Sequence, residues 1–231
     1  MDKLAAWSPN LLALLVIALA GLGSSVATSR LARWRDARWL DRPNHRSLHE
    51  RPTPRNGGLA IVGSILIGVL ALSGIGGYHP NMGLLLLGVT PVTAVALLDD
   101  LTDLSVRARL LAQLVAAALL LLSLEALPPL TLPGMVPASP SAVPAPGVTA
   151  LTGPVAWLGL YLFVIWMTNL YNFMDGMDGF AAGMTVYGFG TLALLGGLAG
   201  QAQFVLWCTL LCAAAGGFLR HNFPPARIFM G

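Results

Sequence analysis

Seven apolar segments, each close to the length of a membrane span, constrain this chain more than any other feature of its sequence. A helix needs roughly 20 apolar residues to cross the hydrocarbon core of a bilayer, because each residue adds about 1.5 Å. Only 10% of the residues are charged, against about 25% in ordinary soluble domains, which excludes a soluble globular enzyme. We therefore predict an all-α polytopic membrane protein with one transmembrane domain over residues 1–231. The segments are 11–29, 57–76, 82–98, 108–124, 154–174, 179–199 and 203–219.

The first segment is open to a second interpretation. Lys3 precedes it, as a positive charge precedes the apolar region of a secretory signal peptide. The length of the segment and the lack of a clear small-x-small cleavage site favour a membrane span. Cys208 and Cys212, the two cysteines, lie in an apolar run and do not indicate a metal site.

Arginine is unevenly distributed, and this predicts the orientation of the chain. Residues 30–55 hold eight arginines and three acidic residues. Short loops rich in Lys and Arg stay in the cytoplasm, so the loop over residues 30–56 is predicted inside and the N-terminus outside. Counting spans places residues 99–107, 175–178 and 220–231 on the same cytoplasmic face. The proline-rich residues 125–153 carry no Lys or Arg and are predicted to form an extracytoplasmic loop.

Five of the eight aspartates fall into two short clusters at the cytoplasmic ends of predicted spans. The clusters are Asp99-Asp100-Leu-Thr-Asp103 and Asp175-Gly-Met-Asp178. A lone carboxylate at a helix end is usually solvated, but crowded carboxylates repel each other unless a cation lies among them. Mg²⁺ binds one or two carboxylates together with a substrate's phosphate oxygens, so the clusters indicate a magnesium site.

The second cluster ends a longer series, Asn169-x-x-Asn172-x-x-Asp175-x-x-Asp178. A three-residue spacing places these groups along one ridge if the segment is helical. Buried amides are costly in a span without partners, although Asn also joins helices by hydrogen bonds.

The arginine-rich loop has features that a plain cytoplasmic loop does not need. Its prolines stiffen it, Gly57-Gly58 permits a close approach of the backbone, and its arginines suit phosphate groups. His45 and His49 are spaced as a helical metal pair would be, but the prolines argue against a helix there. Capture of a polyanion is the favoured interpretation, and the three polar patches together indicate phosphate chemistry at the inner membrane surface.

These residues resemble the polyprenyl-phosphate N-acetylhexosamine-1-phosphate transferases, which form glycosyltransferase family 4. Four motifs carry the resemblance, and they occur in the same order as in the family. Their amino-acid sequences are most similar to those of the branch that initiates O-antigen or related surface glycans. They lie at residues 41–58, 98–113, 169–179 and 222–231.

The resemblance implies a Mg²⁺-dependent enzyme, with Mn²⁺ as an alternative metal, in the bacterial cytoplasmic (inner) membrane. Its partners would be undecaprenyl phosphate, a UDP-N-acetylhexosamine and the lipid bilayer, with no nucleic acid; a homodimer is left open. The implied catalytic residues are Asp99, Asp100 and Asp175, with Asp99 deprotonating the lipid phosphate, and the implied metal ligands are Asn172 and Asp175. The implied substrate-binding residues are Asp41, Arg46, His49, Arg55, Asn169, Asp178, Asn222 and Arg227.

One departure from the family is large. Family members continue after the Phe-Met-Gly at residues 229–231 with an Asp that binds Mg²⁺, further spans and a histidine-bearing loop. We therefore expect residues 1–231 alone to be inactive, as an N-terminal fragment of a longer bundle.

Three other classes compete with this interpretation. An intramembrane prenyltransferase would use Asp99, Asp100 and Asp103 as an Asp-Asp-x-x-Asp motif, but it leaves the other motifs unexplained. A transporter would bury its charges near the midplane, whereas these acids cluster at one interface. A catalytically dead paralogue with a structural role is the third alternative.

Overall fold

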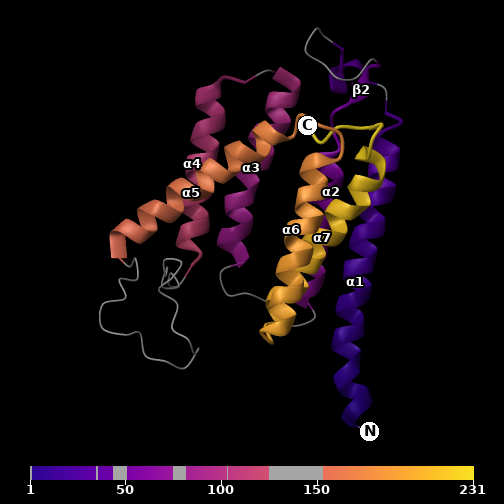
Figure 1. Cartoon of the computed structure of the whole chain (residues 1–231), viewed down its shortest axis with the longest axis vertical. Coiled ribbons are helices and arrows are strands. Elements are labelled where there is room, and N and C mark those ends of the chain that lie inside the picture. The colour runs from indigo at the N-terminus through magenta and orange to yellow at the C-terminus, as the bar shows by residue number, and fades with distance from the viewer. Residues whose placement is uncertain (1, 35, 44–50, 75–81, 103, 125–152) are drawn as a thin grey trace. The chain divides into compact units, whose positions relative to one another are not determined.

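Seven α-helices form most of the chain in its computed structural model, which describes all residues except 1, 35, 44–50, 75–81, 103 and 125–152 (Figure 1). Each helix covers one of the seven predicted apolar segments, so the all-α architecture is confirmed. The helices are α1 (Asp2–Leu31), α2 (Gly58–Gly74), α3 (Met82–Thr102), α4 (Val106–Leu122), α5 (Gly153–Met174), α6 (Phe180–Leu198) and α7 (Ala202–Asn222).

Four of these helices are long and apolar enough to cross a membrane: Asn10–Leu31 within α1, and the whole of α5, α6 and α7. Helix α2, with 17 residues, is apolar but shorter. The chain is accordingly a multi-pass membrane protein, and the crossing of all seven helices stays a prediction. The proline-rich loop predicted at 125–153 lies almost wholly outside the described residues.

Local sequence explains where several helices begin and end. The Ser105 hydroxyl accepts a hydrogen bond from the Ala108 amide at 3.3 Å and caps the start of α4. Pro154 lies in the first turn of α5, where its missing N–H costs nothing. Pro224 and Pro225 follow the end of α7 and cannot continue it.

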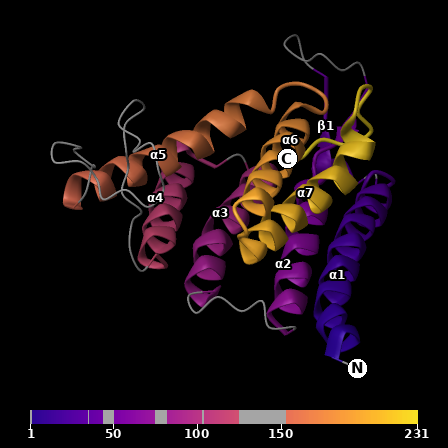
Figure 2. The same cartoon turned by 60° about the horizontal axis from the view of Figure 1, so that its bottom comes forward.

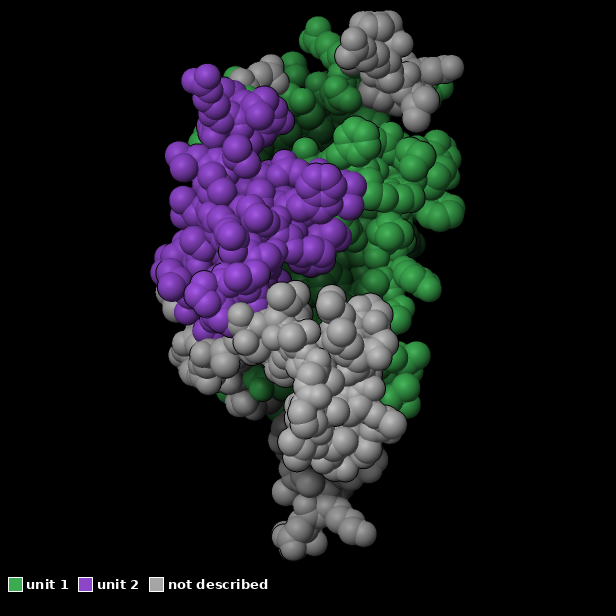
Figure 3. Space-filling view, turned by 60° about the vertical axis from the view of Figure 1, so that its left-hand side comes forward, with its two compact units in different colours: residues 1–80, 95–104, 171–231 green, residues 81–94, 105–170 purple. Residues whose placement is uncertain are grey.

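The chain divides into two compact units, drawn in different colours in Figure 3. Unit 1 contains Met1–Pro80, Val95–Leu104 and Tyr171–Gly231, and unit 2 contains Asn81–Ala94 and Ser105–Leu170. Helices α3 and α5 each contribute residues to both units.

Unit 1 is built around α7, which packs against α1, α2 and α6 (Figures 1 and 2). Small residues let α1 and α7 approach closely, and the buried Ser24 hydroxyl donates to the Ala214 carbonyl at 2.7 Å. The next residue of α1 is Ser25, and its hydroxyl lies 3.1 Å from His221 Nε2. These contacts fix the ends of α1 and α7 at the same level.

Unit 2 is held by polar contacts between its own helices. The Tyr161 hydroxyl of α5 donates to the Leu114 carbonyl of α4 at 3.0 Å, and the Asn169 amide donates to Gln113 Oε1 at 2.6 Å. Asn169 thus has the helix-joining role that the sequence left open for a polar residue in a span.

The arginine-rich loop contains a short antiparallel pairing that the sequence did not indicate. Strand β1 (Leu40–Asp41) pairs with β2 (Thr53–Pro54), and a 3-10 helix, η1 (Ala37–Trp39), precedes β1. Asp36 begins η1: its carboxylate accepts from the Arg38 amide and pairs with the Arg38 guanidinium at 2.7 Å. The half-buried Asp36 carboxylate is therefore occupied by a local ion pair.

Candidate active site

The last residues of the chain dock against the start of α2 through main-chain hydrogen bonds. The Phe229 amide donates to the Pro54 carbonyl at 2.7 Å, and the Gly57 amide donates to the Phe229 carbonyl at 3.0 Å. The Gly58 amide donates to the Met230 carbonyl at 2.7 Å. Two motifs that are more than 170 residues apart in the sequence thus form one backbone framework.

Gly57 is required by this docking. A Cβ atom at Gly57 would collide with the ring of Phe218 and lie only 2.7 Å from the Phe229 carbonyl oxygen. Phe218 and Ile228 are fully buried and form a small core with Ala182. The predicted close approach at Gly57-Gly58 is confirmed, and its partner is the C-terminal segment.

The loop between α5 and α6 carries the second acidic cluster. Helix α5 ends at Met174, so Asp175 and Asp178 do not continue the predicted ridge of Asn169 and Asn172. The ridge was expected only if the whole segment were helical, and the helix ends one residue before Asp175. The helix stops because Gly176 and Gly179 follow closely, and Gly179 adopts a φ of 73°, which other residues rarely tolerate.

Two side-chain bridges join this loop to the C-terminal segment. Asp178 Oδ2 accepts a hydrogen bond from the Ala226 amide at 2.8 Å. Asn222 Oδ1 accepts from the Gly179 amide at 2.9 Å, while Asn222 Nδ2 donates to the Ile228 carbonyl at 2.9 Å. Residues 175–179 and 222–231 therefore form one connected structure.

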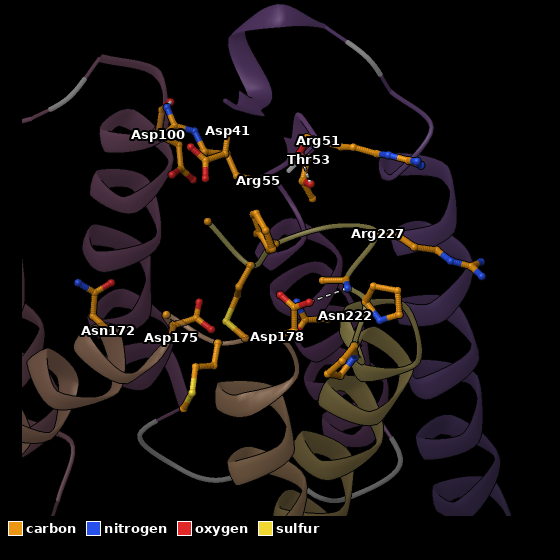
Figure 4. Close-up of a pocket in the computed structure, with 18 residues that line it drawn as sticks. Asp41, Arg51, Thr53, Arg55, Asp100, Asn172, Asp175, Asp178, Asn222 and Arg227 are labelled. Atoms are coloured by element: carbon orange, nitrogen blue, oxygen red, sulfur yellow. Dashed lines mark hydrogen bonds between the residues drawn. The ribbon is translucent and has the colours of Figure 1, made fainter. Parts of the chain in front are cut away.

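These segments enclose a pocket of about 1430 Å³ within unit 1 (Figure 4). This volume exceeds the ~300–1,000 Å³ that a small ligand usually occupies, so it has room for a large polar ligand or for two substrates. Its walls come from the arginine-rich loop, the end of α3, the loop after α5 and the C-terminal segment. The charged and amide residues that line it are Asp41, Arg51, Arg55, Asp100, Asn172, Asp175, Asp178, Asn222 and Arg227.

Asp175 is the pocket carboxylate with the fewest partners. Neither a hydrogen bond nor an ion pair is found for its side chain among the described residues. Partial burial raises the pKa of Asp175 from 3.8 to about 6, since desolvation disfavours the charged form. Such a group is stabilised by a cation that enters the pocket.

Asp100 lies at the end of α3, beyond the apolar residues 82–98. Burial raises its pKa to about 6; the neighbouring Arg55 guanidinium opposes this rise, and the nearby Asp99 adds to it. Arg55 Nη2 donates to the Asp100 carbonyl at 2.6 Å. Arg55 Nε is buried and has no hydrogen-bond partner among the described residues, so this guanidinium retains a donor for an anion.

The other predicted site residues differ in where the structure puts them. Asp99 is outside the pocket lining, and its carboxylate accepts from the Leu104 amide at 2.8 Å. Asn169 belongs to unit 2. Arg46 and His49 lie outside the described residues. Arg227 lines the pocket but is exposed, and Figure 4 shows its side chain pointing away from the acids.

Several lining residues were not predicted individually. Arg51 and Thr53 enter through the β1–β2 pairing, and Phe229, Met230 and Gly231 enter through the docking on α2. The sequence signal for the second group was Gly57-Gly58, which indicated a close approach without identifying its partner.

The donor set allows a test of whether the pocket suits Mg²⁺. Among the described residues, no three His, Cys, Asp or Glu side chains are grouped closely enough to enclose a metal alone. The available donors are the Asp175 carboxylate, the Asn172 amide and the Asp100 carboxylate. This set fits a Mg²⁺ ion that keeps water and shares a substrate's phosphate oxygens, and it does not fit a closed protein-only site.

Helices of a multi-pass membrane protein, with a pocket of carboxylates and arginines at the end of one helical unit, define the general class of this chain. The sequence profile of glycosyl transferase family 4 matches residues 82–231. The chain belongs to this family, and the predicted membership is confirmed.

Individual relatives agree with this assignment. The chain is 33% identical over 198 residues to a Bacillus subtilis protein named "Probable undecaprenyl-phosphate N-acetylglucosaminyl 1-phosphate transferase", with 83% of this chain and 50% of the relative covered. It is 32% identical over 191 residues to the phospho-N-acetylmuramoyl-pentapeptide-transferase of Shouchella clausii, with coverage of 78% and 55%. It is 30% identical over 203 residues to the decaprenyl-phosphate N-acetylglucosaminephosphotransferase of Mycobacterium tuberculosis, with coverage of 82% and 48%. The chain thus spans about half the length of the curated relatives it matches.

Proposed function

We propose that the protein transfers an N-acetylhexosamine-1-phosphate from a UDP-sugar to a polyprenyl phosphate such as undecaprenyl phosphate, and releases UMP. Family membership supports this reaction, and so do the names of the relatives, each of which refers to a phospho-sugar transfer. The product would begin a lipid-linked surface glycan such as O-antigen or another cell-wall polymer.

The observation that carries the proposal is the composition of the pocket. Asp175 lacks a protein partner among the described residues, and Arg55 has an unused donor beside Asp100. Carboxylates hold a divalent cation, while a guanidinium binds phosphate oxygens directly. A pocket with both features suits the exchange of one phosphate ester for another.

Asp175 and Asn172 are the residues that would hold Mg²⁺, with Mn²⁺ as an alternative. When bound, the metal would neutralise the charge that develops on the diphosphate during transfer. The Asp175 carboxylate and the Asn172 amide oxygen would be its protein ligands, in keeping with the preference of Mg²⁺ for oxygen donors.

On the lipid side, Arg55 and Asp100 orient the polyprenyl phosphate. One of its oxygens attacks the sugar-bearing phosphorus, a new P–O bond forms, and the P–O bond to the UMP phosphate breaks. A proton on the attacking phosphate would pass to a carboxylate, and Asp100 is the one that lines the pocket. Asp99, the predicted base, would support this step by ending α3 through its bond to the Leu104 amide.

The nucleotide would occupy the side of the pocket formed by the 175–179 loop and the C-terminal segment. Asp178 and Arg227 both line this side. Arg46, His49 and Asp41 belong to the arginine-rich loop and are proposed to bind the same ligand. The identity of the N-acetylated sugar is a matter for direct substrate comparison.

The pocket would face the cytoplasm of a bacterial cell from the inner membrane. Arg30 lies in the last turn of α1, and exposed arginines at positions 33, 38 and 42 follow that helix; Arg220 lies in the last turn of α7. Positive residues are retained on the cytoplasmic side. A UDP-sugar is a cytoplasmic substrate, so this orientation agrees with the proposed reaction.

The test is to measure UMP release by the protein produced from its whole reading frame, supplied with UDP-N-acetylglucosamine, undecaprenyl phosphate and Mg²⁺. We expect turnover in the wild type and a loss on the order of 10²- to 10⁴-fold in Asp175→Asn and in Asp100→Asn, because each loses a charge used in the transition state.

Asp36→Asn is the matched control, because it makes the same chemical change at a carboxylate that pairs with Arg38 and does not line the pocket. Its turnover should equal that of the wild type. Release of diphosphate instead of UMP would contradict the proposal and favour a prenyltransferase, as would full activity of both pocket variants.

A further inference from the structure

Asn222 is buried in a way that separates it from the other polar residues of the pocket. Its side chain is only 4% exposed, whereas Asp178 and Arg227 are exposed. Its oxygen accepts from the Gly179 amide and its nitrogen donates to the Ile228 carbonyl, both at 2.9 Å. Both functional ends of the amide are therefore used within the protein.

The two hydrogen-bond partners of Asn222 lie at the end of the acidic loop and next to the residue that docks on α2. Gly179 ends the loop that carries Asp175 and has the left-handed backbone that starts α6. Ile228 is fully buried, and the next residue, Phe229, makes the first main-chain bonds to the start of α2. A single side chain thus connects the acidic loop to the segment that docks on the arginine-rich loop.

We propose that Asn222 is a positioning residue, which holds the Asp175 loop in register with the C-terminal segment and does not itself bind the nucleotide. Its effect on turnover rests on the proposed function, whereas its mechanical role does not. Asp178 adds a parallel bridge to Ala226, but from an exposed position where water competes for the bond. Asn222 is consequently the stronger of the two links.

Replacement by aspartate should make this bridge depend on pH. A protonated carboxylic acid has one acceptor oxygen and one O–H donor, so Asn222→Asp can rebuild both bonds at low pH. The ionised form has no donor and faces the Ile228 carbonyl with a negative charge. The buried location favours the neutral form, so the bridge should be present in acid and lost in alkali.

The first experiment measures amide hydrogen exchange by mass spectrometry on the 231-residue chain in detergent, comparing each variant with the wild type at the same pH. In Asn222→Ala, peptides covering residues 175–182 and 226–231 should both exchange about tenfold faster or more, because two buried hydrogen bonds are lost. In Asn222→Asp this difference should be large at pH 8 and small at pH 5.

Thr209→Val is the matched control, since it removes a hydroxyl bond that stays within α7, from Thr209 Oγ1 to the Val205 carbonyl. Exchange in both segments should stay unchanged. If Asn222→Asp exchanges at wild-type rates in both segments at pH 8, the bridge does not exist and the proposal fails. This outcome is readable even if Asn222→Ala does not fold.

The second experiment measures UMP release by Asn222→Asp in the protein from the whole reading frame. Its kcat relative to the wild type should rise at least ~5-fold from pH 8 to pH 6, while KM for the UDP-sugar should change less than ~3-fold. A raised KM with unchanged kcat and unchanged exchange would identify Asn222 as a nucleotide ligand and overturn the proposal. An inactive wild type with the expected exchange would instead refute only the proposed function.

Discussion

Asp175→Asn should make the protein more stable and inactive at the same time. The Asp175 carboxylate is partly buried, has no protein partner among the described residues and has its pKa raised to about 6 by desolvation. In the absence of a divalent cation, the folded wild type at pH 8 therefore carries a charge that water would solvate better. Asparagine has nearly the same shape and no charge, so it removes this cost.

The magnitude follows from the pKa. A rise from 3.8 to about 6 corresponds to about 3 kcal/mol at most, and solvent contact reduces this to about 1–2 kcal/mol. Between these two pKa values the unfolded carboxyl loses its proton before the folded one, so the free energy of unfolding falls as the pH rises. The increase in the free energy of unfolding that Asp175→Asn produces should thus be fully present above pH 6 and absent below pH 4.

The assay is thermal unfolding of the purified chain in detergent with EDTA, at pH 4 and at pH 8. A gain of about 1–2 kcal/mol should raise Tm by about 2–8 °C at pH 8 in a chain of this size, with little change at pH 4. Asp36→Asn should show no such gain, because its pKa is lowered to about 2 by Arg38. Equal Tm values for Asp175→Asn and the wild type at pH 8 would refute the reasoning.

Two further predictions concern Arg55 and the membrane orientation. In Arg55→Gln the pKa of Asp100 should rise above its present value of about 6, because the guanidinium now opposes that rise. The acid limb of the pH profile of kcat/KM should then move to higher pH, whereas Arg55→Lys should stay closer to the wild type. An unchanged acid limb in Arg55→Gln would contradict the role assigned to Arg55. Single cysteines at Ser105 and Gly176, in a background without Cys208 and Cys212, should react with an impermeant reagent only from the cytoplasmic side, and one at Ser139 only from outside; labelling of Ser105 from outside would overturn the orientation.

The helices were predictable because the bilayer imposes a length on them. Apolar segments of about 20 residues are visible in the sequence without any knowledge of tertiary contacts. The β1–β2 pairing was not predictable, because two residues per strand are too few to show an alternating pattern. Sequence reasoning therefore succeeded for the helices, whose length is set by the thickness of the bilayer.

The site was predictable as a set of motifs but not as an arrangement. The resemblance implied both Asp99 and Asp100 at the site, with Asp99 as the base, but adjacent residues of a helix point about 100° apart and only one of the two lines the pocket. The structure selects Asp100. The ridge failed at Asp175 because the following glycines end α5, a local backbone effect that outweighed the three-residue spacing.

The docking of the C-terminal segment on α2 was hidden for a different reason. Its hydrogen bonds join main-chain groups of Phe229 and Met230 to those near Gly57, and main-chain groups leave no side-chain signature. Gly57 and Gly58 indicated only that another segment packs closely against the backbone there. Asn222 was likewise expected at the ligand, because sequence does not distinguish an exposed amide from a buried one.

The contact between α1 and α7 joins two helices that are synthesised far apart in time. Ser24 and its partner Ala214 are separated by 190 residues, which a ribosome adding 5–20 residues per second completes in roughly 10–40 s. Throughout that time α1 lies in the bilayer without α7, whose Ala214 carbonyl accepts the hydrogen bond of the Ser24 hydroxyl. Ser24 must meanwhile bond within its own helix, as Thr28 does to the Ser24 carbonyl at 2.7 Å. The period in which α1 is able to pair with another nascent chain is thus set by the rate of translation and not by the rate of folding.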